Sequence, residues 1–347
     1  MPQYGSLAGR RTITERVATL PKAELHLHLE GTLEPELIFE LAARNRVRLP
    51  YASVDDLRRR YAFTDLQSFL DLYYANMRVL RTAQDFRDLT TAYLARARQA
   101  GVRHAEVFFD PQAHTSRGVP LAEALAGVTE ALSDSEREYG VSTGLVVTFL
   151  RDLSADSAMS TLESVLDLGS PVLGVGLDSA EMGHPPAKFA EVFARARAEG
   201  LRCVAHAGEE GPPEYITDAL DVLRVERIDH GVRCLEDDGL VERLVRDRIP
   251  LTVCPLSNVR LRVVDDLAAH PIVRMRDRGL LVSVNSDDPS YFGGYVDENY
   301  GQLAREFGLD ASTLAELARN SFESAFLEPP RRDALLAEVA AWRQAVT

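Results

Sequence analysis

Regular alternation between apolar, strand-like segments and amphipathic, helix-like segments constrains the fold of this chain more than any other feature. Parallel strands that are covered by helices on both faces are almost continuously apolar, and the segments here have that character. Seven of them follow one another along the chain, at 102–110, 142–150, 172–181, 201–209, 227–232, 250–258 and 280–288. With an alternating segment at 22–31, they predict eight strands, each followed by helix. The eightfold repetition favours a closed (β/α)8 barrel over an open doubly wound sheet.

The chain length and the order of these segments predict a single domain of 347 residues. We assign residues 1–20 to a helical lead-in, 21–290 to the barrel and 291–347 to C-terminal helices. A helical pattern also fills residues 50–100, so we expect extra helices after the first strand. The chain has no Pro- or Ser-rich linker, and no Gly-x-Gly-x-x-Gly motif follows the first strand, which weakens a dinucleotide-binding alternative.

The composition excludes several classes of partner. The net charge is −14, with 53 acidic and 39 basic side chains, which argues against binding to nucleic acid or to an anionic membrane surface. The three cysteines form no Cys-x-x-Cys pair, so a disulfide framework is not expected. The N-terminus has no signal-peptide pattern, and no apolar run reaches the ~20 residues that span a bilayer. We therefore predict a cytoplasmic protein with a small-molecule partner, and the sequence leaves a homo-oligomer open.

The segment at 22–31 carries the first chemical signal. Its alternation places His26 and His28 on one face of the predicted strand and three leucines on the other. Two imidazoles on one face of a strand can hold a single metal ion. The alternative is that one or both are hydrogen-bonded core histidines, and other strand ends decide between the two interpretations.

Polar residues follow three later strands at the ends where a (β/α)8 barrel builds its active site. Strand five ends in His206 to Glu209, strand six in Asp229 to Gly231, and strand eight in Asn285 to Asp288. Because these ends meet at one face of a barrel, we expect their side chains to line one cavity. The other four histidines are interpreted as structural or surface residues: His104, His114, His184 and His270.

This set of donors suits one zinc ion, which prefers nitrogen and oxygen ligands. The predicted ligands are His26, His28, His206 and Asp287, and they leave a position for water. Glu209 is the candidate general acid and His230 the candidate base. A two-metal site bridged by a carbamylated lysine is disfavoured, because the two lysines of the chain, Lys22 and Lys188, do not follow strand four.

The motifs HLHLEG, HAGE, DHG and NSDDP together resemble the adenosine/adenine deaminase family of the amidohydrolase superfamily, over residues 20–328. The resemblance implies zinc-dependent, hydrolytic deamination of a 6-aminopurine with loss of ammonia. It implies that Glu209 protonates ring N1 while a zinc-activated water attacks C6. It further implies that His230 deprotonates the attacking oxygen and that Asp288 hydrogen-bonds ring N7.

Several stretches, among them FTDLQSFLDLYY and GLDSAEMGHPPAKF, resemble the adenine deaminase branch of that family. Adenosine deaminases typically carry an aspartate where this chain has Glu30, and we expect the longer side chain to fill the ribose space. The predicted reaction is adenine to hypoxanthine, a step of purine salvage, with Glu181 helping to fix the base edge. A capping or surface role is the alternative for Glu181. Adenosine and N6-substituted adenines are the alternative substrates, and a non-catalytic purine-binding protein is the remote alternative.

Overall fold

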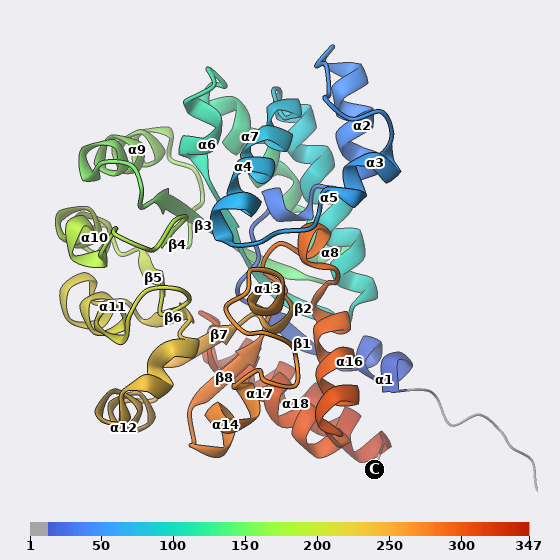
Figure 1. The fold of residues 1–347 in the computed structure, drawn as a ribbon, viewed down its shortest axis with the longest axis vertical. Helices are drawn as coiled ribbons and strands as arrows, with labels where there is room; N and C mark the ends of the chain where they lie inside the picture. Colours follow the sequence, from blue (N-terminus) through green and yellow to red (C-terminus); the bar gives the residue numbers. More distant parts are fainter. Residues whose placement is uncertain (1–12, 347) are drawn as a thin grey trace, which may run out of the picture.

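The fold is a (β/α)8 barrel, as predicted. The computed structural model describes residues 13–346, and within them each of eight strands pairs in parallel with the next (Figure 1). The strands are β1 Lys22–Glu24, β2 Val102–Phe109, β3 Ser142–Leu150, β4 Gly174–Asp178, β5 Arg202–Ala207, β6 Arg227–His230, β7 Pro250–Val253 and β8 Leu281–Val284. Because all eight run the same way around the barrel, their carboxyl ends gather at one opening.

The first strand is shorter than the segment predicted at 22–31, and the reason lies in how the barrel closes. The N–H of Leu25 donates to the Asn285 side chain at 2.8 Å instead of to a strand backbone. Backbone pairing then resumes, with the N–H of His28 donating to the carbonyl of Asp287 at 3.0 Å. The first and last strands therefore meet at the residues that carry the histidine motif.

The seventh strand is also shorter than predicted. The sequence pattern suggested strand over 250–258, but β7 ends at Val253 and α13 begins at Pro255 and ends at Arg260. Proline has no N–H for a strand ladder and its fixed φ suits the first turn of a helix. The chain therefore turns over the carboxyl end of the barrel at this point.

Helices cover the outside of the barrel between successive strands. Residues 121–139 form two successive helices, α7 and α8, and residues 213–223 form a short α-helix continued by a π-helical turn. The covering elements are α6 Pro111–Thr115, α7 Leu121–Ser133, α8 Ser135–Tyr139, α9 Ala155–Leu168, η3 Pro186–Phe189, α10 Ala190–Ala198, α11 Pro213–Asp218, η4 Ala219–Leu223, η5 Val232–Glu236, α12 Asp238–Arg246 and α14 Ile272–Asp277.

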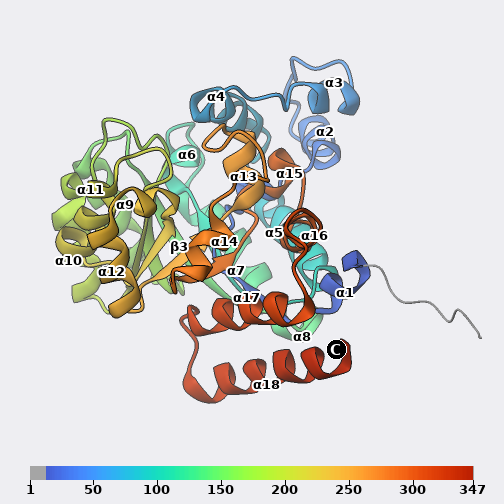
Figure 2. The same ribbon diagram turned by 60° about the horizontal axis from the view of Figure 1, so that its bottom comes forward.

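An insertion of extra helices follows the first strand, as predicted. Figure 2 shows α4 beside α13 at one end of the barrel, and α17 and α18 at the opposite end. Capping boxes at Asp65 and Thr82 fix the starts of the two longest inserted helices. The inserted elements are η1 Glu30–Thr32, α2 Pro35–Arg44, α3 Val54–Arg59, α4 Leu66–Asn76, η2 Met77–Val79 and α5 Ala83–Gln99.

The C-terminal helices cover the amino ends of the strands. The N–H of Ala23 in β1 donates to the hydroxyl of Ser321 in α17 at 2.9 Å. Within residues 13–346, no helix is long and apolar enough to span a membrane. The assignment of the whole chain to one domain stays a prediction. The remaining helices are α1 Ile13–Thr19, α15 Pro289–Phe292, α16 Val296–Phe307, α17 Ala311–Glu323 and α18 Pro329–Val346.

Candidate active site

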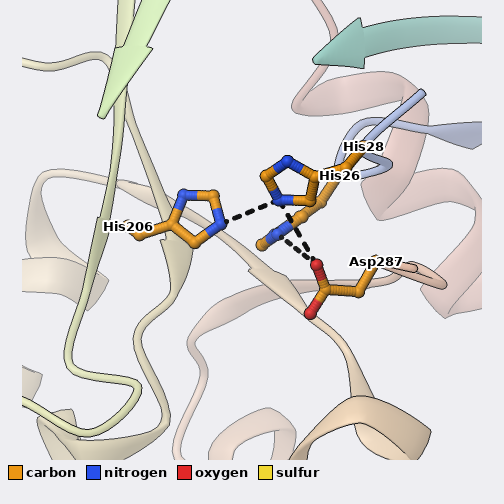
Figure 3. A group of neighbouring side chains, drawn as sticks. All are labelled: His26, His28, His206 and Asp287. Atoms are coloured by element: carbon orange, nitrogen blue, oxygen red, sulfur yellow. Dashed lines mark hydrogen bonds and ion pairs between the residues drawn. The ribbon is translucent and has the colours of Figure 1, made fainter. Parts of the chain in front are cut away.

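The four predicted metal ligands converge at the carboxyl end of the barrel (Figure 3). Nε2 of His28 lies 3.2 Å from Nε2 of His206. Oδ1 of Asp287 lies 3.3 Å from Nε2 of His26 and 3.4 Å from Nε2 of His28. All four side chains are buried, although they come from three distant parts of the sequence.

The ring nitrogens and the carboxylate of these four residues are better placed to bind a metal ion than to hydrogen-bond one another. Among the described residues, Nε2 of His26 has no hydrogen-bond partner, although it is buried. Burial and the neighbouring imidazoles, His26 first, hold the pKa of His206 well below its usual range, so this ring is neutral. Imidazole nitrogens aimed at one point, beside a carboxylate, form a donor set suited to a divalent cation. The structure therefore contains a candidate metal site.

In His26 and His28, the ring nitrogen that faces away from this point lies near an oxygen atom. Nδ1 of His26 lies 3.0 Å from the hydroxyl of Thr252, which itself donates to Asp229 at 2.7 Å. Since the Thr252 proton is used on Asp229, the threonine oxygen accepts from Nδ1–H of His26, which leaves Nε2 of His26 free to coordinate. Nδ1 of His28 lies 3.5 Å from Oδ2 of Asp178. Such contacts orient metal-binding histidines and set their tautomers.

Glu209 and His230 lie beside the candidate metal site. Nε2 of His230 is 3.5 Å from Oε2 of Glu209 and 3.7 Å from Oδ2 of Asp287. Burial, and then the charge of Asp287, raise the pKa of Glu209 well above its usual range, which favours the protonated form of this carboxyl group. His230 and Asp287 both have left-handed backbone conformations, with φ of 64° and 65°. Strain of this kind is common where side chains must be aimed at a site.

Asp288 points into the same cavity. Its Oδ1 has no hydrogen-bond partner among the described residues, and burial together with Asp287 raises its pKa well above the usual range. The backbone at Gly31 packs directly against it, because a Cβ at this position would lie 2.6 Å from Cα of Asp288. The glycine of the HLHLEG motif is thus needed for the close approach of the first and last strands.

Glu181 is not placed against a substrate. Its Oε1 accepts from the N–H of Gly208 at 2.7 Å. Its Oε2 accepts from the N–H groups of Glu209, Glu210 and Gly211, at 3.1, 2.8 and 2.8 Å. The carboxylate therefore holds the loop that carries Glu209, and it does not line the cavity. We expected it at the base edge, and the four loop amides explain why it lies elsewhere.

Glu30 also lies behind the cavity wall. Its Oε1 accepts from the N–H of Asp110 at 3.1 Å and lies 2.7 Å from Nε2 of His114. The side chain is fully buried and is not among the residues that line the cavity. Burial, and then the charge of Asp110, raise its pKa to about 8. The expectation that Glu30 fills a ribose space stays a prediction.

Two acidic residues of the cavity were missed by the sequence reasoning. Asp110 follows β2 and Asp178 ends β4, and both line the cavity. Neither oxygen of Asp178 has a hydrogen-bond partner among the described residues, and burial followed by the charge of Asp110 raises its pKa well above the usual range. Both residues stand at the ends of predicted strands, so the rule that found the histidines would have found them too.

The roof of the cavity comes from α4. Leu66, Phe69, Tyr73 and Tyr74 line it over the metal-site residues. Phe63 packs behind them in an apolar cluster with Phe69. The cavity is therefore apolar and aromatic on one side and carries carboxyl and imidazole groups on the other, which suits a flat, polar-edged ligand.

Comparisons with known proteins agree with this geometry. The family model described as adenosine deaminase matches residues 21–342. Adenine deaminase from Streptomyces coelicolor is 62% identical over 326 residues, which are 93% of this chain and 96% of that protein. The crystal structure of adenine deaminase from Arthrobacter aurescens is 59% identical, with a TM-score of 0.93 over 94% of this chain and 99% of that one. An amidohydrolase from Burkholderia ambifaria, crystallised with bound Zn, is 28% identical, with a TM-score of 0.88 over 98% of this chain and 95% of that one.

Proposed function

This chain belongs to the adenosine deaminase family and is a hydrolytic deaminase, and we propose that its substrate is free adenine, which it converts to hypoxanthine and ammonia. The observation that carries the proposal is the meeting of Glu209, His230 and the four candidate metal ligands in one buried cavity. Relatives that share 55–62% of their residues with this chain are named adenine deaminase. A small purine fits a cavity with an aromatic roof, and the acidic balance of the chain disfavours nucleic acid.

We propose that the metal is one zinc ion per chain, held by His26, His28, His206 and Asp287. Three imidazole nitrogens and one carboxylate oxygen are a typical zinc donor set, and the bound Zn of the Burkholderia ambifaria amidohydrolase supports the choice. When bound, zinc polarises a water molecule and lowers the pKa of that water from 15.7 toward ~7.

Glu209 supplies a proton to ring N1 of adenine. The raised pKa of this carboxyl group keeps it protonated at neutral pH, as a general acid requires. Protonation of N1 withdraws electrons from C6 and makes that carbon electrophilic. His230 lies within 3.5 Å of Glu209 and accepts the proton that the attacking water loses.

Asp288 binds the purine at N7. Its raised pKa favours the protonated form, which donates a hydrogen bond to the N7 lone pair. Its unpartnered Oδ1 and its place in the cavity lining support this role. Glu181 positions the loop of Glu209 and so acts on the reaction through that residue.

The choice between base and nucleoside rests on Glu30. Its hydrogen bonds with His114 and the Asp110 backbone close the wall beside η1, where a longer ligand would need room. Shortening the side chain in Glu30→Asp should loosen this wall. We therefore expect Glu30→Asp to raise kcat/KM for adenosine relative to adenine.

An ultraviolet assay of zinc-loaded protein tests the proposal, with adenine, adenosine and N6-methyladenine in parallel and kcat/KM as the readout. We expect adenine to be preferred. Preference for adenosine or for N6-methyladenine would overturn the choice of substrate while leaving the deaminase chemistry in place. Turnover of none of the three by protein with one zinc per chain would overturn the proposed function as a whole.

A further inference from the structure

Three arginines surround a second pocket, separate from the catalytic cavity. Arg78 lies in η2, Arg81 precedes α5, and Arg117 follows α6. The pocket has a volume of about 320 Å³, and its other lining residues are Gly118 and Val119. None of these residues lines the catalytic cavity. The lining is therefore positive without any acidic side chain.

The absence of acidic partners sets this cluster apart in a chain with a net charge of −14. Within residues 13–346, no carboxylate lies within 4.0 Å of the guanidinium group of Arg78, Arg81 or Arg117. By contrast, Arg44 on the neighbouring α2 pairs with both Asp85 and Asp88. Three arginines without a direct carboxylate partner around one concavity attract an anion, and the attraction grows as water is excluded.

Arg117 is held in place for such a role. Its Nε donates to the carbonyl of Ala113 at 2.8 Å and its Nη2 donates to Nδ1 of His114 at 2.7 Å. Burial, and then repulsion from Arg81 and Arg78, lower the pKa of Arg117 to about 10. An anion in the pocket would relieve this repulsion.

We propose that Arg78, Arg81 and Arg117 form a binding site for a phosphate group. The planar guanidinium fork matches the tetrahedral oxyanion of phosphate in charge and in hydrogen-bond geometry. Free phosphate and a phosphate monoester share this chemistry, and the pocket volume admits either.

Two hydrogen bonds, through His114, link Arg117 of this site to Glu30 behind the wall of the catalytic cavity. Because a guanidinium group only donates, Nδ1 of His114 is an acceptor, and Nε2–H of His114 donates to Glu30. Arg117 therefore sets the tautomer of the histidine that holds the cavity wall. Variants that test the phosphate site should for this reason be made at Arg78 and Arg81 and not at Arg117.

Titration calorimetry of the zinc-loaded protein tests the proposal, with inorganic phosphate in one arm and ribose 5-phosphate in the other. The test variant is Arg78→Gln/Arg81→Gln. The control is Arg46→Gln/Arg48→Gln, which removes the same charge from two exposed arginines after α2. We expect the wild type and the control to bind and the test variant to bind at least about tenfold more weakly per arginine removed.

Each outcome decides the proposal. Binding of either probe that is lost only in the test variant supports it, and the tighter probe identifies free phosphate or a monoester. Equal binding by the test variant and the wild type, or wild-type affinity weaker than about 10 mM, overturns it. Adenine turnover without phosphate reports whether the variants fold, and the single variants Arg78→Gln and Arg81→Gln replace the double variant if it does not.

Discussion

Two buried glutamates of the same barrel have pKa values that are shifted in opposite directions from the ordinary value. Glu106 on β2 lies 2.5 Å from Nη1 of Arg227 and accepts the N–H of Phe326 at 2.6 Å. Burial alone would raise its pKa, but Arg227 and His104 outweigh burial and lower it to about 2. Glu209, at the carboxyl end of the strands, is equally buried, and its pKa is raised well above the usual range. The two environments thus favour the ionised form of Glu106 and the protonated form of Glu209.

The difference shows that the partner, and not the burial, decides what a buried carboxyl group does. Glu106 has a full positive charge beside it and joins β2, β6 and the segment after α17. Glu209 lies near Asp287 and Glu181, and Arg151 opposes their effect only partly. One end of the barrel therefore uses buried charge for stability, and the other keeps a proton ready for transfer.

The largest effect is expected from Glu209→Gln. The amide cannot deliver a proton to N1, so kcat should fall by ~10²–10⁴, the usual contribution of general acid catalysis. Steady-state kinetics and metal analysis on the same sample measure this. Glu210→Gln is the matched control, because its side chain does not line the cavity, and it should retain turnover. Undiminished kcat in Glu209→Gln with zinc retained would remove Glu209 from the mechanism.

A large loss of stability is expected from Glu106→Gln. Removing one partner of a buried ion pair leaves Arg227 with only Asp229 beside it, at 3.6 Å, and should lower the free energy of unfolding by about 3–5 kcal/mol. Urea denaturation at pH 7 measures it. The double variant Glu106→Gln/Arg227→Met should lose less than the single variant, because the buried guanidinium group is removed together with the Glu106 carboxylate, and Asp229 keeps its hydrogen bond from Thr252.

The same pair gives the stability a predictable pH dependence. The folded pKa of Glu106, about 2, lies below its ordinary value of 4.5, so its contribution is complete above pH 4.5 and is lost as the pH falls toward 2. The advantage of the wild type over Glu106→Gln should shrink across that window. A constant difference in unfolding free energy down to pH 2 would mean that the carboxylate charge does not stabilise the fold.

The smallest effect is expected from Asp178→Asn. Asp178 faces Nδ1 of His28, and loss of such a contact typically weakens metal affinity ~10–100-fold. Competition for zinc with a chelator measures it, with the exposed Asp152→Asn as control. Unchanged zinc affinity would show that the backbone alone orients His28.

The sequence was sufficient to predict which residues converge at the candidate metal site, because of a general property of barrels. His26, His28, His206 and Asp287 stand at strand ends, and strand ends meet wherever the strands are parallel. The same rule, applied to the second and fourth strands, would have found Asp110 and Asp178.

Glu181 and Glu30 show where that reasoning stopped. Their positions along the chain indicated a place near the site, but not where their oxygen atoms point. Glu181 turns to four backbone amides of the β5–α11 loop, and Glu30 turns to His114, 84 residues further along the chain. The direction of a loop side chain depends on which donors the tertiary structure brings within reach.

By itself, the sequence determined the barrel, the family and the residues that gather at its carboxyl end, because hydrophobic period and strand order are local properties that repeat along the chain. Only the tertiary structure decided which buried carboxyl groups are ionised, which position a loop and which line the cavity. It also brought three arginines from η2, the start of α5 and the end of α6 around one pocket. These outcomes depend on contacts between residues that are distant in sequence, because the interactions that set pKa values and side-chain directions act over a few ångströms.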